Sequence, residues 1–156
     1  MTGSGMIHNT FVVERSYPQP PAQVFAAFAQ ADKKRKWYAE GDHELEEYVM
    51  DFKVGGGERL RYRFKEGHPI AGMTIENVGS YKDIVPEQRI VEASSMRLNG
   101  TVISVTLVTL EFREKDGGTD LVCTHQGVFY EGSGGWEMRK QGWESLFAKL
   151  TKALDA

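Results

Sequence analysis

The C-terminal segment, residues 136–154, places the strongest constraint on the fold of this chain. Its large apolar residues recur three, four or seven positions apart, the spacing that lines up one face of an α-helix: Trp136, Trp143, Leu146, Phe147, Leu150 and Leu154. Ser133 and two glycines precede the segment, as suits a helix start, and lysines occupy its last turns, where cations complement the helix dipole. A helix of this length spans about 30 Å, so its apolar face needs a whole sheet to cover it.

The remainder of the chain predicts that sheet. Stretches rich in β-branched and aromatic residues, bounded by turn residues, predict seven strands: 10–17, 45–54, 59–64, 73–85, 89–95, 101–113 and 119–130. Pro21 suits the first turn of a helix at 22–30, and a second short helix is expected at 32–38. Asp116-Gly117, between the last two strands, is a hairpin signal. This order predicts an α+β fold, with a curved seven-stranded antiparallel sheet around the long C-terminal helix and two short helices after the first strand.

Composition limits the partners and the location. The 156 residues are enough for one domain; we predict a flexible leader at 1–8, because it is rich in Gly and Ser, and a single domain at 9–156. The net charge is −3 with both signs interspersed, which argues against a nucleic-acid partner or membrane insertion. Cys123 is the only cysteine and no signal-peptide pattern is present, so we expect a cytoplasmic protein. Because the histidines lack metal-ligand spacing, we expect no metal, and we expect no cofactor.

Four stretches in order resemble the signature segments of one superfamily: 15–37, with a proline turn, a helix and a final tryptophan; 50–57, a glycine hairpin; 79–91, two strands around a proline; and 127–154, the closing helix. Together they resemble the SRPBCC (START-like, helix-grip) superfamily, and within it the family named for homology to the activator of the heat-shock protein 90 ATPase. The resemblance implies the helix-grip fold. It implies no single reaction, because the superfamily holds lipid carriers, hormone receptors, polyketide cyclases, hydroxylase domains and co-chaperone domains on one scaffold.

A long helix laid in a curved sheet leaves room for a ligand pocket where large side chains do not reach across. Aromatic residues with polar tips, together with apolar residues of the inner strands and the helix, are the candidate ligand-binding residues: Trp37, Tyr38, Tyr48, Tyr62, Tyr81, Leu110, His125, Trp143 and Phe147. For Trp143, core packing and pocket contact are equally favoured. Gly55-Gly-Gly57 is interpreted as a hairpin turn, because no phosphate-binding Lys-Ser/Thr pair follows it.

His125 is the candidate for chemistry. Strand alternation that turns Leu121 and Cys123 inward also turns His125 inward, where it would serve as a structural residue, a hydrogen-bond donor to a bound carbonyl or carboxylate, or a general base. No catalytic residue is assigned apart from His125, and only if the protein is an enzyme. Cys123 is expected to be an inert core thiol. Arg59, Arg61 and Arg63 are expected on a solvated outer face.

The strand at 101–113 leaves an alternative open. Ile103, Val105 and Leu107 have one parity, whereas Val108, Leu110 and Phe112 have the other. Either a bulge shifts the register within the strand, or a second subunit covers one set, so a homodimer is a further prediction.

The residues suggest a binding protein or an enzyme, and the resemblance to the family adds a protein-interaction module. The first hypothesis is a soluble protein that binds a small hydrophobic or amphipathic molecule between the sheet and the C-terminal helix. The alternatives are a cyclase or hydrolase that uses His125 in that cavity, and a co-chaperone-like protein-interaction module.

Overall fold

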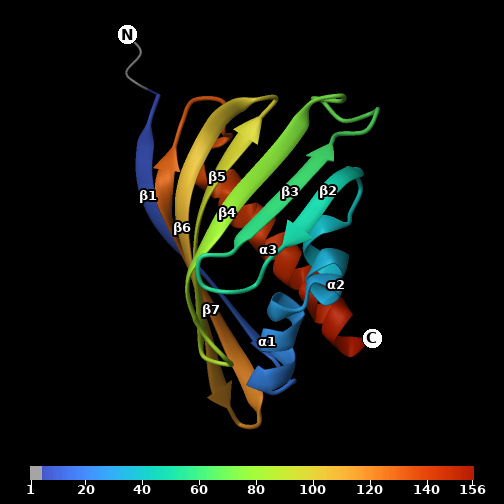
Figure 1. Cartoon of the computed structure of the whole chain (residues 1–156). Helices are drawn as coiled ribbons and strands as arrows, with labels where there is room; N and C mark the ends of the chain where they lie inside the picture. Colours follow the sequence, from blue (N-terminus) through green and yellow to red (C-terminus); the bar gives the residue numbers. More distant parts are fainter. Residues whose placement is uncertain (1–4) are drawn as a thin grey trace.

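The computed structural model describes residues 5–156 and has the predicted α+β architecture. Figure 1 shows the elements in chain order: β1 (Ile7–Tyr17), α1 (Pro21–Ala29), α2 (Ala31–Lys34), the π-helical turn η1 (Arg35–Ala39), β2 (Glu44–Met50), β3 (Gly57–Arg63), β4 (Thr74–Val85), β5 (Arg89–Leu98), β6 (Thr101–Lys115), β7 (Gly118–Phe129) and α3 (Gly135–Asp155). The long C-terminal helix and all seven strands are confirmed, with boundaries that differ by a few residues.

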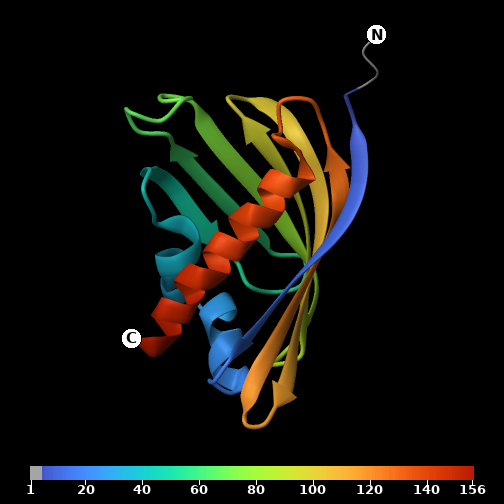
Figure 2. The same cartoon turned by 180° about the vertical axis from the view of Figure 1, so that it is seen from behind.

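The sheet is a single antiparallel layer in the order β1-β7-β6-β5-β4-β3-β2. Strands β2 to β7 follow one another as neighbours, and β1 pairs with β7, so the first and last strands of the chain lie side by side. The sheet curls, and α3 runs diagonally across its concave side with α1 and α2 near its C-terminal end (Figure 2). This is the predicted helix-grip arrangement.

The β6–β7 hairpin has the turn that its sequence predicts. Asp116 and Gly117 have φ values of 54° and 84°, the left-handed conformation that both central residues of a type I′ turn require. Asp tolerates this region better than most side chains, and Gly has no steric penalty there. The turn therefore sets the register of the two long strands.

The expected helix at 32–38 divides into α2 and the π-helical turn η1. The amide of Glu40 donates to the carbonyl of Arg35, which closes one wide turn. The wider turn buries Trp37, Tyr38 and Ala39 in succession, which a regular helix on a flat surface does not do. Tertiary packing of the two aromatic residues decides this local geometry.

Strand β6 turns its even-numbered residues inward. Val108, Leu110 and Phe112 are buried, whereas Val105 and Leu107 lie on the outer face with 44% and 37% exposure. A bulge does occur, but at Ile103 near the start of the strand, where the register with β5 shifts. The bulge therefore explains why Ile103 is buried, and it leaves Val105 and Leu107 exposed.

The ordered sheet begins before the predicted domain boundary. Ile7 and His8 belong to β1 and pair with Phe129 and Val128 of β7. Of the predicted leader 1–8, residues 1–4 lie outside the described part of the chain. Within the described residues, no helix is long and apolar enough to cross a membrane.

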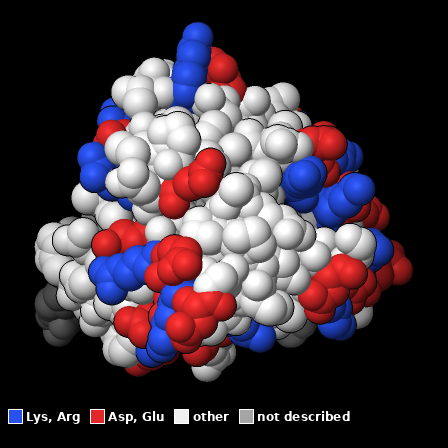
Figure 3. Space-filling view, turned by 90° about the horizontal axis from the view of Figure 1, so that it is seen from below, with Lys and Arg blue, Asp and Glu red and all other residues white. Residues whose placement is uncertain are grey.

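The outer face of β3 is solvated, as its alternation predicts. Arg59, Arg61 and Arg63 point away from the helix and form ion pairs with Glu46, Glu47 or Glu76 of the neighbouring strands. On the face of the molecule in Figure 3, acidic and basic residues are likewise interleaved. Such exposed ion pairs contribute little to stability. Because the two signs alternate among the described residues, neither face carries a patch of one charge.

Aromatic side chains pack closely at the end of the curved sheet that α1 covers. Phe25 and Phe28 of α1 pack edge-to-face on Phe112, with ring centroids 5.2 and 5.3 Å apart, and Trp37 packs on Phe28 at 4.8 Å. The indole nitrogen of Trp37 donates to the carbonyl of Ala27 at 3.0 Å, so its polar atom is satisfied in the core. The helix pair thus packs one end of the curved sheet, and the N-terminal half of α3 covers the other end together with Tyr38 of η1.

Candidate functional site

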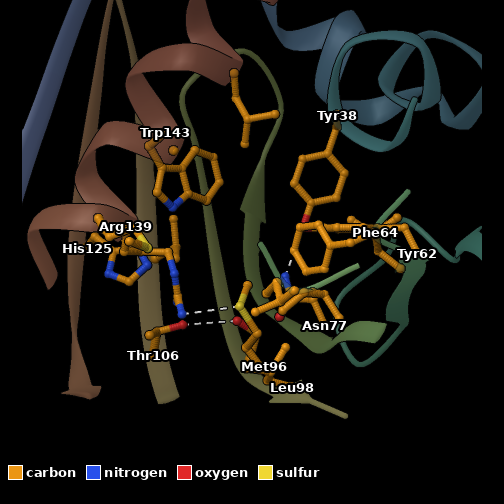
Figure 4. Close-up of a pocket in the computed structure, with 18 residues that line it drawn as sticks. Tyr38, Tyr62, Phe64, Asn77, Met96, Leu98, Thr106, His125, Arg139 and Trp143 are labelled. Carbon is orange, nitrogen blue, oxygen red and sulfur yellow. Dashed lines mark hydrogen bonds between the residues drawn. The ribbon is translucent and has the colours of Figure 1, made fainter. Parts of the chain in front are cut away.

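A cavity of about 360 Å³ lies between strands β3 to β7, in their upper halves as seen in Figure 1, and the N-terminal half of α3. The strands line it with large apolar side chains: Leu60, Tyr62, Phe64, Ile75, Met96 and Leu98. The helix contributes residues spaced at one, three or four positions on its inner face: Met138, Arg139, Gly142, Trp143 and Leu146. Figure 4 shows these side chains converging from the sheet and from the helix.

Small residues keep this space open. Ser94 and Thr106 line the cavity from β5 and β6, and Gly142 lines it from α3. A Cβ atom added to Gly142 would meet no neighbouring atom within 4 Å. Gly142 is exposed, so it lies where the cavity meets solvent, and a glycine inside a helix costs roughly 1 kcal/mol relative to alanine.

Four of the nine candidate ligand-binding residues line the cavity: Tyr38, Tyr62, His125 and Trp143. The other five do not line it: Trp37, Tyr48, Tyr81, Leu110 and Phe147. Trp37, Leu110 and Phe147 are packed in the core beyond the cavity. Trp143 combines the two roles considered for it, because it faces the cavity and also packs on Phe147 with ring centroids 5.5 Å apart.

Tyr48 and Tyr81 face a buried acidic cluster instead of the cavity. The Tyr48 hydroxyl donates to Glu58 Oε2 at 2.5 Å, and Lys34 Nζ lies 2.7 Å from the same oxygen. Glu92 reaches toward Glu58 across Gly79, where any Cβ would overlap with its carboxyl group. Burial and the neighbouring carboxylate Glu58 raise the pKa of Glu92 well above its ordinary value, so Glu92 keeps its proton at pH values where Glu58 is ionised.

Lys34 balances the remaining charge of the cluster. Although burial opposes ionisation of Glu58, the charge of Lys34 and hydrogen bonds from Glu92, Lys34 and Tyr48 hold its pKa below the ordinary value. The cluster therefore contains one cation, one anion and one neutral carboxyl group. It lies directly beside the cavity, because Glu58 and Glu92 are each two residues from a lining position, Leu60 and Ser94.

His125 points inward, as predicted, and is surrounded by aromatic rings. Its ring stacks on Phe11 with centroids 4.5 Å apart and lies 5.9 Å from Phe129 and 6.2 Å from Trp143. The residue is 1% exposed and its Nδ1 has no hydrogen-bond partner among the described residues. Burial, aided by the charge of Arg139, lowers its pKa to about 3, so the imidazole is neutral near pH 7.

Arg139 extends from α3 into the same end of the cavity. Its Nη2 donates to Ser104 Oγ at 2.8 Å and lies 3.2 Å from the sulfur of Met96. The guanidinium carbon lies 5.4 Å from the centre of the Phe129 ring. Within residues 5–156 no carboxylate forms an ion pair with Arg139, and burial lowers its pKa from the ordinary value.

Four other polar side chains of the cavity form two pairs. Asn77 donates to the Tyr38 hydroxyl at 2.9 Å, and the hydroxyls of Ser94 and Thr106 lie 3.0 Å apart. Burial is the largest cause of the raised pKa of Tyr38, so its hydroxyl is neutral. Among the described lining residues, Arg139 is the one cation, and His125 lies beside it with an unpaired ring nitrogen.

Cys123 and the loop histidines take no part in the site. Cys123 is fully buried and burial raises its pKa to about 12, as expected of an inert thiol. His43 stacks on Tyr62, and His68 on Phe64. In the described part of the chain, no group of three or more His, Cys, Asp or Glu side chains is arranged to hold a metal ion.

Sequence reasoning missed Arg139 and the Lys34–Glu58–Glu92 cluster, although each has a signal in the sequence. Arg139 lies four residues before Trp143 and seven before Leu146, so it falls on the apolar face of the helix. Glu92 lies two residues after Ile90, on the inward side of its strand. A charged residue at an inward position is the pattern that would have identified both.

Several bacterial proteins of known structure have the same fold. The Mll3558 protein from Rhizobium loti is 38% identical, with a TM-score of 0.84 over 95% of this chain and 98% of that one. A protein from Rhizobium leguminosarum is 36% identical, with a TM-score of 0.88 over 96% of both chains. Protein CV1439 from Chromobacterium violaceum is 21% identical, with a TM-score of 0.78 over 95% of this chain and 98% of that one, which supports the fold alone. No curated protein matches the chain.

The family comparison agrees with the fold. Residues 18–155, nearly the whole chain, match the family described as Activator of Hsp90 ATPase homolog 1-like protein. The match spans both short helices, six of the seven strands and α3, and so includes every element that lines the cavity. The chain therefore belongs to the family of Activator of Hsp90 ATPase homolog 1-like proteins.

Proposed function

We propose that this protein binds a small hydrophobic or amphipathic molecule in the cavity between the curved sheet and α3. The observation that carries the proposal is the cavity itself, 360 Å³ of space with a mainly apolar lining in a fold whose other end is tightly packed. Natural ligand pockets have volumes of roughly 300 to 1,000 Å³ and this kind of lining.

Burial of the ligand supplies the affinity. Each Å² of apolar surface removed from water stabilises the complex by roughly 25 cal/mol, before the cost of association is subtracted. The aromatic rings of Tyr38, Tyr62 and Trp143 offer broad faces for this contact. No chemical step is needed for such a function.

The surroundings of His125 favour binding over catalysis. A general base works best when its pKa lies near the working pH, whereas the pKa of His125 is about 3. Its nearest ring partners are Phe11, Phe129 and Trp143, and none of these accepts or donates a catalytic proton.

The test is displacement of a fluorescent apolar probe, 1-anilinonaphthalene-8-sulfonate or N-phenyl-1-naphthylamine, from the purified protein. Two variants at Gly142, at the exposed edge of the cavity, provide a matched pair, because both remove the helix-destabilising glycine but only leucine is long enough to obstruct the opening. Gly142→Ala should bind the probe as the wild type does. Gly142→Leu should lose most of the binding while it stays folded by circular dichroism. Equal binding by Gly142→Leu and wild type would place the probe outside the cavity and contradict the proposal.

A specific observation keeps protein binding as a second candidate. Val12, Val105 and Leu107 are exposed on the outer face of the sheet, away from the cavity. A partner protein, as the description of the family suggests, or a second copy of this chain would cover such residues. The homodimer therefore stays a prediction, and sedimentation velocity of wild type against Leu107→Lys tests it.

The cytoplasmic location also stays a prediction, to be tested by cell fractionation.

A further inference from the structure

The charged group at one end of the cavity gives information about the ligand. Figure 4 shows Arg139, His125 and Trp143 on the wall formed by α3 and β7, with Tyr62 and Phe64 on the opposite wall. The first wall holds a cation, and the opposite one is aromatic. A molecule that fills the cavity is therefore expected to be polar at one end and apolar at the other.

Arg139 lacks the partner that a largely buried arginine ordinarily has. Arg61 and Arg63, on the outer face, are exposed and each lies 3.0 to 3.2 Å from a carboxylate oxygen of Glu46. Among residues 5–156, the hydrogen-bond partners of Arg139 are the hydroxyl of Ser104 and the thioether of Met96. A guanidinium has five N–H donors and does not lose its proton in proteins, so most of its donor capacity remains free.

His125 provides a second group with unused capacity beside Arg139. It is almost completely closed to bulk solvent, it lines the cavity, and its Nδ1 has no hydrogen-bond partner among the described residues. As a neutral imidazole it offers one N–H donor and adds no charge. A single positive charge with neutral donors around it matches one negative charge, not the two charges of a phosphate monoester.

We propose that the cavity binds an organic acid, with the carboxylate of the ligand on Arg139 and His125 and its apolar body between Leu60, Phe64, Ile75 and Leu98. This inference rests on the proposed function, because it assumes that the cavity holds a ligand. A planar guanidinium pairs with a carboxylate through two parallel hydrogen bonds, which fixes the orientation of the acid. The apolar lining then selects the length and shape of the body.

The experiment measures binding of matched acids and alcohols by isothermal titration calorimetry. Decanoate and decanol form an aliphatic pair, and 1-naphthaleneacetate and 2-(1-naphthyl)ethanol form an aromatic pair. In each pair that fits the cavity, the acid should bind the wild type on the order of ten- to a hundredfold more tightly than the alcohol, the effect of a charge-assisted hydrogen bond. The pair with the tighter acid identifies the class of the apolar body.

The variant Arg139→Gln should lose this preference by weakening the acid alone, and Arg139→Lys should keep part of it. Acid binding should also raise the pKa of His125, which is read from its ring resonances by nuclear magnetic resonance. An alcohol that binds the wild type as tightly as its acid would overturn the carboxylate site but leave the proposed function intact. If no member of either pair binds and Gly142→Leu leaves probe binding unchanged, both the proposed function and this inference fail.

Discussion

Lys34 Nζ lies 2.7 Å from Glu58 Oε2 on the concave side of the sheet, and only 6% and 3% of these side chains are exposed. The pair joins α2 to β3 and lies beside the cavity. Its desolvation is costly, and the Tyr48 hydroxyl on the same oxygen offsets part of that cost. The pair therefore holds α2 against β3, a strand that also lines the candidate site.

Removal of one partner should destabilise the protein strongly. Lys34→Met leaves the carboxylate of Glu58 buried without its cation, which costs about 3 to 5 kcal/mol in comparable cases. Urea unfolding followed by circular dichroism measures the loss. Lys53→Met is the matched control, since Lys53 lies 3.6 Å from Asp51 on the exposed surface and its removal should have little effect. The double variant Lys34→Met/Glu58→Leu should recover most of the stability, and failure to do so would mean that the lysine acts through packing.

The protonated carboxyl group of Glu92 predicts a pH dependence. Its pKa is raised above 4.5 in the folded state, so its contribution to stability is complete at pH values below 4.5 and is lost as the pH rises toward the folded-state pKa. Glu58 has the opposite shift and contributes above pH 4.5. Glu92→Gln keeps a hydrogen-bond donor but no titrating proton. The variant should therefore gain stability relative to the wild type as the pH rises above 4.5, measured by urea unfolding at a series of pH values. An effect of Glu92→Gln that is the same at every pH would contradict a protonated Glu92.

The depressed pKa of His125 predicts a loss of stability in acid. The unfolded chain binds a proton near pH 6.5, whereas the folded protein does so only near pH 3, so the contribution present above pH 6.5 is lost as the pH falls. The slope from this residue is about 1.4 kcal/mol per pH unit between the two values. His125→Phe keeps the stacking on Phe11 and removes the titration. The difference in unfolding free energy between this variant and the wild type should grow as the pH falls from 6 to 4. A difference independent of pH would show that the histidine does not titrate in this range.

Arg139 should destabilise the ligand-free protein. Replacement of a buried charge that lacks an ionic partner by an apolar residue of similar length often raises stability, here by about 1 kcal/mol for Arg139→Met. Thermal unfolding of protein stripped of ligand checks this expectation. Arg113→Met provides an exposed control, because Arg113 pairs only with Glu111 at the surface. A clear loss of stability in Arg139→Met alone would identify the bond to Ser104 as structural.

The sequence predicts most of the fold because the relevant signals are local. The helical spacing from Trp136 to Leu154 and the Asp116-Gly117 turn each specify a conformation within a few residues. Alternation along β7 likewise places His125 on the inner face. The π-helical turn at Trp37 and Tyr38 is not predicted, because packing of those rings against the core widens the turn.

The candidate site is predicted only in part, since the cavity depends on contacts between distant segments. The sequence marks Tyr38, Tyr62, His125 and Trp143 as aromatic or polar residues on inner faces, but it marks Tyr48 and Tyr81 in the same way. Tertiary structure separates the two groups by placing Glu58 and Glu92 next to the second.

Local sequence therefore determines which elements form and which of their faces is buried, because periodicity and turn conformation act within one segment. Only the tertiary structure decides that Arg139 faces an apolar cavity without a carboxylate, and that Lys34 meets Glu58 across the fold. The reason is physical: pairing and desolvation depend on which side chains meet after the sheet has curled around the helix, and these neighbours are far apart in the chain.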